Sequence, residues 1–366
     1  MSKIKINIVL FGIGNVGGNL LNQIIESHNF FLDKRKIDLQ FPIIANSKKA
    51  YFNQEESIEN WQINFENLAK NYTIQDIIEY SKNHELENLI AVDATASQDF
   101  IKNYNTLIEA GFNIVAANKK ANTQSLDFYK NVRQYLKKYD KSFLYETNVG
   151  AGLPVINTIR NLYLSGEKFS KIRSVFSGSI SYIFNRFSTE ESTFSNILLD
   201  AERLGLTEPD SRDDLSGHDV ARKLLILARE LNQEIEFSDI KIESLLLPNL
   251  NENNSFQEFE TNKKLLDKPF EIAKITQLGT HVLRYIGEID LENQNFIVKL
   301  ISEPKNSTLG QLKGADNLIE IYTESYGEIP IVIQGAGAGG IVTARGVLSD
   351  ILIISDQLKI KEFVFS

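Results

Sequence analysis

Apolar residues occur along the chain in blocks that predict strands and helices in alternation. Residues 3–11 form a nearly continuous apolar run, which is typical of a strand buried on both faces. Similar runs predict strands at 39–45, 113–117 and 143–146, and another that begins at residue 89. Segments with helical apolar spacing lie between several of these runs, and one of them predicts a long helix at 122–138. The alternation favours a parallel sheet with helices on its faces.

The pattern changes after residue 152. Helices are predicted at 153–164, 193–204, 217–231 and 269–278, and residues 235–265 are predicted to form a polar connection. Strands are predicted at 170–176, 281–289, 296–302, 318–323 and 331–333. This second set is typical of a mixed sheet in a separate domain. A glycine-rich turn then precedes an apolar helix at 341–355, where we expect the chain to return. The predicted domains are therefore 1–152 with 335–366, and 153–334.

Composition excludes several functional classes. The net charge of -9, with both signs interspersed, argues against general binding to nucleic acid or to an anionic membrane. The absence of cysteine excludes disulfides, thiolate metal sites and cysteine nucleophiles. Four histidines, far apart in the chain, do not favour a multi-histidine metal site. No apolar run reaches the ~20 residues that span a bilayer, so we expect a cytoplasmic protein.

A glycine-rich turn links the first strand to a helix. The turn reads Gly12-Ile13-Gly14-Asn15-Val16-Gly17. In such a turn the first glycine permits the sharp bend and the second lets a pyrophosphate approach the backbone. The third lets the helix pack on the strand. Free N–H groups at the helix start would face the phosphates. The motif predicts a dinucleotide site, and a glycine-rich turn of another α/β protein is the alternative.

The end of the second strand carries Asn46-Ser47-Lys48-Lys49 instead of an acidic residue. Many NAD-binding folds place a carboxylate here to bind the ribose 2′-hydroxyl. Neutral and basic residues favour NADP(H), whose 2′-phosphate needs donors and positive charge, while NAD(H) stays possible. Lys48 and Lys49 could also be ordinary solvated lysines.

Other strand ends also carry polar residues. Thr95 follows the strand that begins at residue 89, and it could contact a nucleotide, cap the next helix, or do both. Lys119 follows the next strand and would point into a ligand-binding crevice, unless it is a surface lysine. Glu146 precedes a loop rich in carbonyl groups, which could hold a hard cation.

Acidic residues are concentrated before the helix predicted at 217–231. The segment from Glu208 to Asp214 contains four carboxylates, and Asp219 lies four residues before Lys223. Side chains four apart on a helix are neighbours. Taken by spacing alone, Asp219 and Lys223 form an ordinary exposed ion pair, and proton chemistry is the alternative.

Six stretches, in the same order, resemble the homoserine dehydrogenase family. They are residues 12–17, 116–121, 145–154, 177–184, 207–223 and 335–346. The run from Glu208 to Lys223 is the most specific of them. Residues 177–184 and 224–230 are most similar to the dehydrogenase half of bifunctional aspartokinase–homoserine dehydrogenases. With no kinase or ACT regulatory domain in this sequence, we expect a stand-alone dehydrogenase.

The resemblance implies a fold, a reaction and a partner. The fold would combine a Rossmann-type nucleotide-binding domain with a mixed-sheet α/β catalytic and dimerisation domain. The reaction would be the reversible, NAD(P)H-dependent reduction of L-aspartate 4-semialdehyde to L-homoserine. It belongs to threonine, methionine and isoleucine biosynthesis. A homodimer is expected.

The resemblance also implies residue roles. Lys223 would donate a proton to the forming alkoxide. The substrate would be bound by Glu208, Asp219, Asp214, Gly178, Ser179 and Lys119. Cofactor contacts would come from Gly12, Ile13, Gly14, Asn15, Val16, Gly17, Thr95, Ala96, Lys119 and Gly340. A monovalent cation, Na⁺ or K⁺, would be held by Glu146, Val149, Ala151 and Leu153, three of them through backbone oxygens.

Two residues depart from the expected pattern, and two alternatives stay open. His218 precedes Asp219 at a variable position, where it could give the site a pH dependence. Arg345 stands where a small residue is expected, and could reach the cofactor, a domain interface or solvent. The alternatives are a dehydrogenase for another semialdehyde or amino acid, and a non-catalytic nucleotide-sensing module.

Overall fold

The computed structural model describes residues 3–53, 58–251 and 255–365. The chain forms two compact units. The first contains residues 1–152 and 339–366, and the second contains residues 153–338. The chain returns to the first unit at residue 339, after the predicted residue 335, because the last strand of the second unit continues to Ala336.

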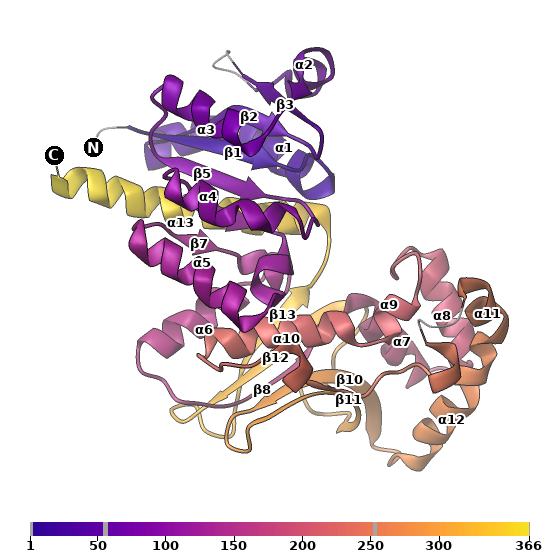
Figure 1. The fold of residues 1–366 in the computed structure, drawn as a ribbon. Helices are drawn as coiled ribbons and strands as arrows, with labels where there is room; N and C mark the ends of the chain where they lie inside the picture. The colour runs from indigo at the N-terminus through magenta and orange to yellow at the C-terminus, as the bar shows by residue number, and fades with distance from the viewer. Residues whose placement is uncertain (1–2, 54–57, 252–254, 366) are drawn as a thin grey trace. The chain divides into compact units, whose positions relative to one another are not determined.

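The first unit is built on a seven-stranded sheet in the order β4-β3-β2-β1-β5-β6-β7 within the described residues (Figure 1). Its strands are β1 (Ile4–Phe11), β2 (Ile37–Ala45), β3 (Lys49–Phe52), β4 (Lys70–Asn71), β5 (Leu89–Asp93), β6 (Asn113–Ala116) and β7 (Phe143–Leu144). The strands β2, β1, β5, β6 and β7 pair in parallel. This confirms the Rossmann-type expectation, and the nearly complete burial of β1 explains its unbroken apolar sequence.

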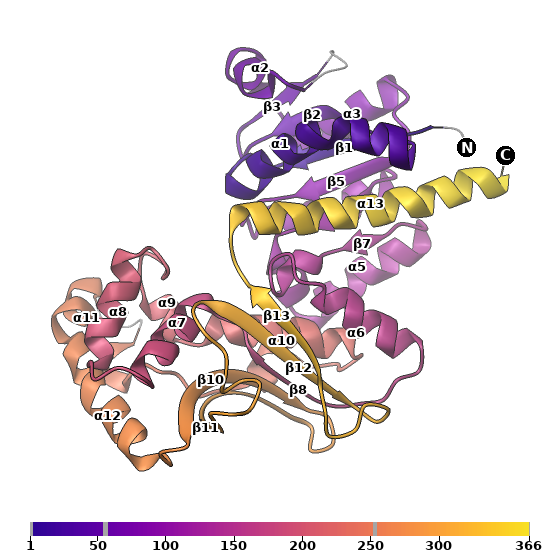
Figure 2. The same ribbon diagram turned by 180° about the vertical axis from the view of Figure 1, so that it is seen from behind.

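Helices cover both faces of this sheet. They are α1 (Asn15–Phe30), α2 (Trp61–Leu68), α3 (Ile74–Asn83), α4 (Tyr104–Glu109), α5 (Leu126–Lys138) and α13 (Gly340–Phe365). Figure 2 shows α1 and α13 on one face of the sheet, with α13 drawn in yellow. Gln23 of α1 donates from Nε2 to the carbonyl oxygen of Ile341 at 2.9 Å. The last segment of the chain therefore completes the first unit.

Two predictions for the first unit were wrong in detail. Strands β3 and β4 form an antiparallel edge that the sequence did not reveal. The reason is local, because the Asn46 side chain accepts the N–H groups of Lys48 and Lys49 at 2.8 and 2.7 Å and closes a tight turn. The helix predicted at 122–138 begins only at Leu126, since the Ser125 hydroxyl caps it by accepting the N–H of Phe128.

The second unit contains a six-stranded mixed sheet in the order β13-β12-β8-β10-β11-β9 within the described residues. Its strands are β8 (Phe169–Val175), β9 (Lys241–Ile242), β10 (His281–Asp290), β11 (Asn295–Pro304), β12 (Asp316–Thr323) and β13 (Ile331–Ala336). Its helices are α6 (Val155–Leu164), α7 (Gly178–Phe187), α8 (Phe194–Arg203), α9 (Arg212–Leu215), α10 (His218–Glu230), α11 (Phe256–Asn262) and α12 (Asp267–Thr276). The mixed sheet was predicted, whereas β9 and α11 fall where only a polar connection was expected.

One face of the second sheet packs against helices. A Cβ atom at Gly287 of β10 would lie 3.1 Å from the Phe176 ring and 3.2 Å from the Leu224 side chain of α10. Close approach of a helix to a strand at this point therefore requires glycine. Beyond the sheet, Phe184, Phe187, Phe194 and Phe270 form an aromatic cluster that joins α7, α8 and α12. Its closest pair is Phe194 and Phe270, with ring centroids 3.9 Å apart.

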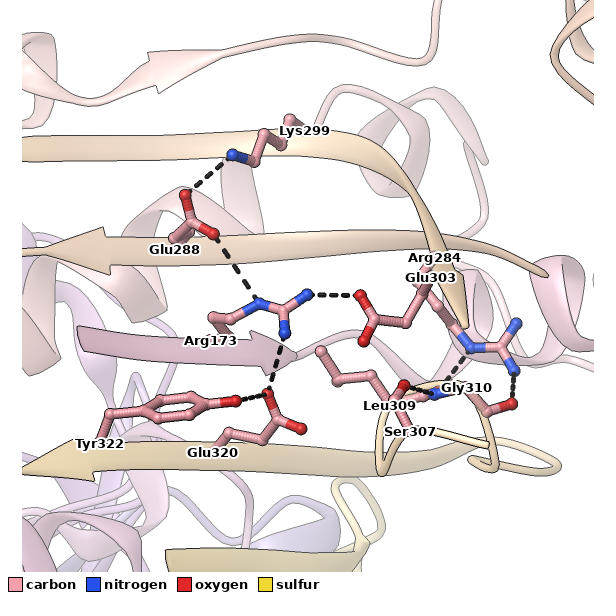
Figure 3. Close-up of polar contacts among 10 residues, drawn as sticks. All are labelled: Arg173, Arg284, Glu288, Lys299, Glu303, Ser307, Leu309, Gly310, Glu320 and Tyr322. Carbon is pink, nitrogen blue, oxygen red and sulfur yellow. Dashed lines mark hydrogen bonds and ion pairs between the residues drawn. The ribbon is translucent and has the colours of Figure 1, made fainter. Parts of the chain in front are cut away.

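The other face of the second sheet carries a buried ionic network (Figure 3). Arg173 of β8 lies between three glutamates, and it contacts Glu303 at 2.5 Å and Glu320 at 3.3 Å. Glu288, 3.8 Å from Arg173, also binds Lys299 at 2.8 Å. Only 2% of the Glu320 side chain is exposed. Because Glu288, Glu303 and Glu320 lie on β10, β11 and β12, the guanidinium links β8 to three other strands through charge.

No helix in the described parts of the chain is both long and apolar enough to cross a membrane. This includes α13, which packs against α1 and β6 of the first unit.

The Arg173 network gives a prediction about stability. Arg173→Leu leaves buried glutamates without their main partner, which typically costs about 3–5 kcal/mol. We expect the free energy of unfolding in urea to fall by that amount near neutral pH.

The matched control is Lys168→Leu. Lys168 pairs with Glu324 at 2.9 Å, but both side chains are more than half exposed. Such pairs contribute about 0–1 kcal/mol, so the control should stay close to wild type. Equal losses in the two variants would contradict the role given to Arg173.

Candidate active site

The carboxyl ends of the parallel strands meet at one edge of the first sheet. Phe11 pairs in register with Asp93, and Asp93 pairs with Ala116. On the far side, Val115 pairs with Leu144. The turns that follow β1, β5, β6 and β7 therefore lie along a single edge. The predicted cofactor residues of the first unit lie in these turns or, in the case of Gly340, at the start of α13.

The glycines after β1 have three different environments. Gly12 has φ of 96°, and a Cβ atom there would lie 2.7 Å from the carbonyl oxygen of Ala94. A Cβ atom at Gly17 would lie 1.9 Å from the carbonyl oxygen of Gly12. Both positions thus require glycine for the turn itself. Gly14 is exposed, and a Cβ atom there would meet no described atom within 4 Å, so space remains beside the backbone.

The start of α1 offers unsatisfied N–H groups. Gly14 is its N-cap and provides no side-chain cap, so the first N–H groups are open to a ligand. Asn15 is exposed, whereas Ile13 and Val16 pack against the apolar core. Gly340 begins α13 beside this turn, since a Cβ atom there would lie 2.2 Å from Asn15 Oδ1. The residues predicted at Gly12–Gly17 and Gly340 are therefore brought together.

Basic residues follow β2. Lys48 and Lys49 are exposed in the β2–β3 turn. Within residues 3–53, 58–251 and 255–365, neither lysine has a carboxylate within ion-pair distance. Their charges are open to solvent or to an anion.

The loop after β7 is buried. Glu146 is 5% exposed, and Val149 and Ala151 are also buried. The Glu146 N–H donates to Asp350 Oδ2 at 2.9 Å, which anchors the loop to α13. Gly150 and Ala151 have φ of 79° and 53°, a left-handed pair that bends the backbone sharply. Leu153, the fourth predicted cation ligand, is the first residue of the second unit.

Glycines in α13 and the loop after β7 permit their close packing. A Cβ atom at Gly346 would lie 2.5 Å from Thr147 Cγ2, and one at Gly152 would lie 2.6 Å from the carbonyl oxygen of Val342. No cluster of three or more His, Cys, Asp or Glu side chains suited to a metal occurs in the part of the chain that the structure describes. A cation held here would depend mainly on backbone oxygens, as predicted.

Lys223 is the central residue of the candidate site in the second unit. Its Nζ donates to the carbonyl oxygen of Phe176 at 2.8 Å and pairs with Asp219 Oδ2 at 2.8 Å. Its side chain is 12% exposed, and that of Asp219 is 41% exposed. The ordinary exposed pair suggested by spacing is therefore wrong for Lys223, because most of its side chain is buried next to the end of β8.

The helix that carries Lys223 begins at a glycine for a steric reason. Gly217 precedes α10 with φ of 78°, and a Cβ atom there would lie 2.2 Å from the Tyr285 hydroxyl oxygen. That hydroxyl donates to the carbonyl oxygen of Glu243 at 2.9 Å. The tight contact fixes the start of α10, and with it the positions of Asp219 and Lys223.

Asp214 connects the acidic segment to α7. Its Oδ1 accepts the Ser179 hydroxyl at 2.5 Å, and its Oδ2 accepts the Glu208 N–H at 2.8 Å. Burial raises the pKa of Asp214, the two hydrogen bonds oppose this, and the carboxylates of Glu208 and Asp219 raise the pKa further. Asp214 thus positions Ser179 and the Glu208 backbone, while the Glu208 side chain stays exposed.

The start of α7 completes this cluster. Ser177 caps the helix by accepting the N–H of Ile180 at 3.3 Å, and its hydroxyl lies 2.8 Å from that of Ser179. A Cβ atom at Gly178 would lie 2.9 Å from the carbonyl oxygen of Ala315. Both roles proposed from sequence for this turn, capping and a place in the site, are compatible with this geometry.

Two functional groups were missed from sequence. The Phe176 carbonyl accepts from Lys223 and also from Asn317 Nδ2 at 3.0 Å. Asn317 is fully buried, and a Cβ atom at Gly337 would clash with its side chain. A backbone carbonyl has no sequence signature, and Asn317 is distant in the chain. Of the two departures noted in the sequence, Arg345 is exposed, and the His218 ring packs edge-on against Phe237.

Comparison with known proteins agrees with both units. Residues 154–352 match the family model "Homoserine dehydrogenase", and residues 12–146 match "Homoserine dehydrogenase, NAD binding domain". A homoserine dehydrogenase of Schizosaccharomyces pombe is 32% identical over 367 residues, covering 98% of this chain and 97% of the relative.

Longer and more distant relatives also match. The bifunctional aspartokinase/homoserine dehydrogenase of Buchnera aphidicola is 41% identical over 354 residues, which are 96% of this chain. The chain spans only 43% of the length of that relative. A solved hyperthermophilic archaeal homoserine dehydrogenase in complex with NADPH has a TM-score of 0.73 at 22% identity, covers 97% of this chain and 98% of its own, and therefore shares the fold.

The two family models together account for most of residues 12–352, and one relative matches nearly end to end. The chain belongs to the homoserine dehydrogenase family.

Proposed function

We propose that this protein catalyses the reversible reduction of L-aspartate 4-semialdehyde to L-homoserine with a nicotinamide cofactor. The observation that carries the proposal is Lys223, a largely buried lysine held between Asp219 and the Phe176 carbonyl. A solvated surface lysine would not be fixed in this way. Family membership gives the reaction, and the lysine gives it a proton donor.

The chemistry needs positive charge at one oxygen. When bound, the reduced nicotinamide supplies the hydride to the carbonyl carbon. Negative charge then develops on the carbonyl oxygen, where a fixed ammonium group stabilises it and donates a proton. Lys223 Nζ is that group in our proposal. In the oxidation of homoserine the same nitrogen takes the proton back.

The acidic residues suit the other end of the substrate. Both homoserine and aspartate semialdehyde carry an ammonium group, which pairs with carboxylates. Glu208, Asp214 and Asp219 lie close enough for two of them to raise the pKa of the third. We assign Glu208 and Asp219 to substrate binding, and Asp214 to holding Ser179 and the Glu208 backbone. Gly178 then brings the backbone of α7 close to the substrate.

The turn after β1 fits a dinucleotide. Open space beside Gly14 and uncapped N–H groups at α1 suit a pyrophosphate. We propose that NADP(H) is preferred, because the β2–β3 turn presents two lysines instead of a carboxylate. Thr95, Ala96 and Lys119 would contact the cofactor from the neighbouring strand ends.

The loop after β7 fits a monovalent cation. Glu146 contributes a buried carboxylate, and its N–H donates to Asp350 of α13, which holds the loop in place. Carboxylate and backbone oxygens are the donors that hard cations take. We propose that Glu146, Val149, Ala151 and Leu153 hold Na⁺ or K⁺, which would order the loop.

The remaining assignments follow the family. We propose a homodimer, a cytoplasmic location, and a place in threonine, methionine and isoleucine biosynthesis. A monomer mass in sedimentation velocity at micromolar concentration would remove the dimer from the proposal.

The first prediction concerns Lys223. The protein should reduce NADP⁺ in a homoserine-dependent reaction, followed by nicotinamide absorbance. Lys223→Ala should lower kcat by at least about 100-fold, since a positioned proton donor contributes about 10²–10⁴-fold. NADPH affinity, measured by fluorescence titration, should be nearly unchanged.

Arg222→Ala is the control on the same helix, and it should keep most of the activity. Wild-type protein without homoserine-dependent turnover would sink the proposed activity. Full turnover in Lys223→Ala would remove only the lysine from the mechanism.

The second prediction concerns cofactor choice. Lys48→Ala/Lys49→Ala should raise KM for NADPH about tenfold, the loss expected for charge-assisted contacts to a phosphate. KM for NADH, which lacks the 2′-phosphate, should not change. Lys137→Ala, an exposed lysine on α5, is the control. An equal rise in KM for both cofactors would refute the assignment.

The third prediction concerns the cation. At constant ionic strength, NaCl or KCl should raise the thermal midpoint of the wild type above its value in tetramethylammonium chloride. Glu146→Gln should abolish this difference because the charged ligand is gone. Glu66→Gln, at an exposed position on α2, should retain it. A wild type indifferent to the choice of cation would argue against the site.

A further inference from the structure

Asp93, at the end of β5, is a buried carboxylate that the proposed mechanism does not use. It is 1% exposed. Its Oδ1 accepts the Thr95 N–H at 2.9 Å, and its Oδ2 accepts the Tyr104 hydroxyl at 2.7 Å and Asn118 Nδ2 at 2.9 Å. Burial raises the pKa of Asp93, and its bonds to Thr95, Tyr104 and Asn118 oppose that rise. The carboxylate is thus held in place by donors from three segments.

The backbone of the same residue holds one of these segments again. The Asp93 carbonyl accepts the N–H groups of Ala117 and Asn118, at 2.9 and 3.3 Å. Strand pairing between β5 and β6 ends at Asp93 and Ala116. Beyond that point Asp93 provides the contacts that the ladder no longer supplies. Its side chain and backbone together connect the turn at 94–97 to the turn at 117–120.

Asn118 makes this connection specific. Its Nδ2 also donates to the Ser97 carbonyl at 2.9 Å and to Thr95 Oγ1 at 3.3 Å. Its Oδ1 accepts the Lys120 N–H at 3.1 Å and caps the short turn that begins at Lys119. The amide can face only one way, because the flipped orientation would place its oxygen against a carboxylate and a carbonyl.

These two turns carry Thr95, Ala96 and Lys119. Thr95 and Lys119 are half-buried and Ala96 is exposed, so each is accessible in part. Asp93 and Asn118 are buried at 1% and 3%. The buried pair therefore lies beneath the accessible residues and touches both turns that bear them. Fixing binding groups before the ligand arrives lowers the ordering cost of binding.

We propose that Asp93 and Asn118 are positioning residues that lock these two turns together, so that Thr95, Ala96 and Lys119 meet the nicotinamide cofactor in a fixed arrangement. The inference rests on the proposed cofactor site. It adds two residues that act through others and do not touch the cofactor themselves.

Asp93→Asn is the sharpest change. The new amide keeps the size of the side chain and can keep its bond to the Thr95 N–H. Its NH₂ group can donate to the Tyr104 hydroxyl, which can also accept. It cannot bond to the NH₂ group of Asn118, so the side-chain link from Asp93 to the second turn is lost while the backbone bonds to Ala117 and Asn118 remain.

The test measures NADPH affinity by fluorescence titration and stability by thermal melting, on the full chain. Asp93→Asn and Asn118→Ala should each raise Kd about tenfold, which corresponds to about 1.4 kcal/mol. The double variant should bind NADPH about as weakly as the weaker-binding single variant, because both changes break the bond between Asp93 and Asn118. In steady state, KM for the cofactor should rise more than kcat falls.

Tyr104→Phe is the matched control. It removes the third donor to the same carboxylate, from α4, and leaves both turns connected. Its melting temperature should fall while Kd stays within about twofold of wild type. A structural role alone would lower stability in Tyr104→Phe and Asp93→Asn and leave Kd unchanged in both.

The outcomes separate the two proposals. Unchanged Kd in Asp93→Asn, or the same rise in Kd for Tyr104→Phe, overturns the positioning role while the proposed function stands. Wild-type protein that does not bind NADPH overturns the cofactor site and this inference with it.

Discussion

Charge removed from water needs a fixed partner, and this constraint runs through both units. Lys223 is held by a carboxylate and a carbonyl, Arg173 by three glutamates, and Asp93 by three donors. Arg284 donates to the carbonyl oxygens of Leu309 and Gly310, which orders the segment after β11 (Figure 3). In each case the partner fixes the orientation of the charged side chain as well as compensating its charge, because a hydrogen bond weakens steeply when its donor–hydrogen–acceptor angle is small.

The buried cations Arg173, Lys223 and Arg284 have different kinds of partner. The Arg173 network is satisfied by ionic side chains, and it links strands of one sheet. The Lys223 ammonium contacts the Asp219 carboxylate and the neutral Phe176 carbonyl. Burial depresses the pKa of Arg284 to about 10, and the charge of Glu303 opposes that shift.

Local chemistry was readable from the sequence. The glycines at 12–17, the strand runs and the Asp219–Lys223 spacing all depend on residues within one turn or one strand. The glycine requirement at Gly17 follows from the nearby Gly12 carbonyl, and that at Gly12 follows in part from its own φ of 96°. Contacts across long sequence separations were not readable. Asn317 against Phe176, Glu303 against Arg173 and Asp350 against Glu146 each join segments more than 100 residues apart. Their side chains look ordinary until the sheets bring them together.

The contact between Lys223 and the Phe176 carbonyl limits how mutation can change this site. The carbonyl oxygen is a main-chain atom, so no change of side chain at position 176 can delete it. Of the two contacts described for Lys223, mutation can therefore remove the one with Asp219 but not the one with the Phe176 carbonyl. Substitution of Phe176 is limited by the packing of its ring against Gly287, and not by the hydrogen bond between its carbonyl and Lys223. The lysine keeps part of its orientation through any substitution that preserves the path of β8.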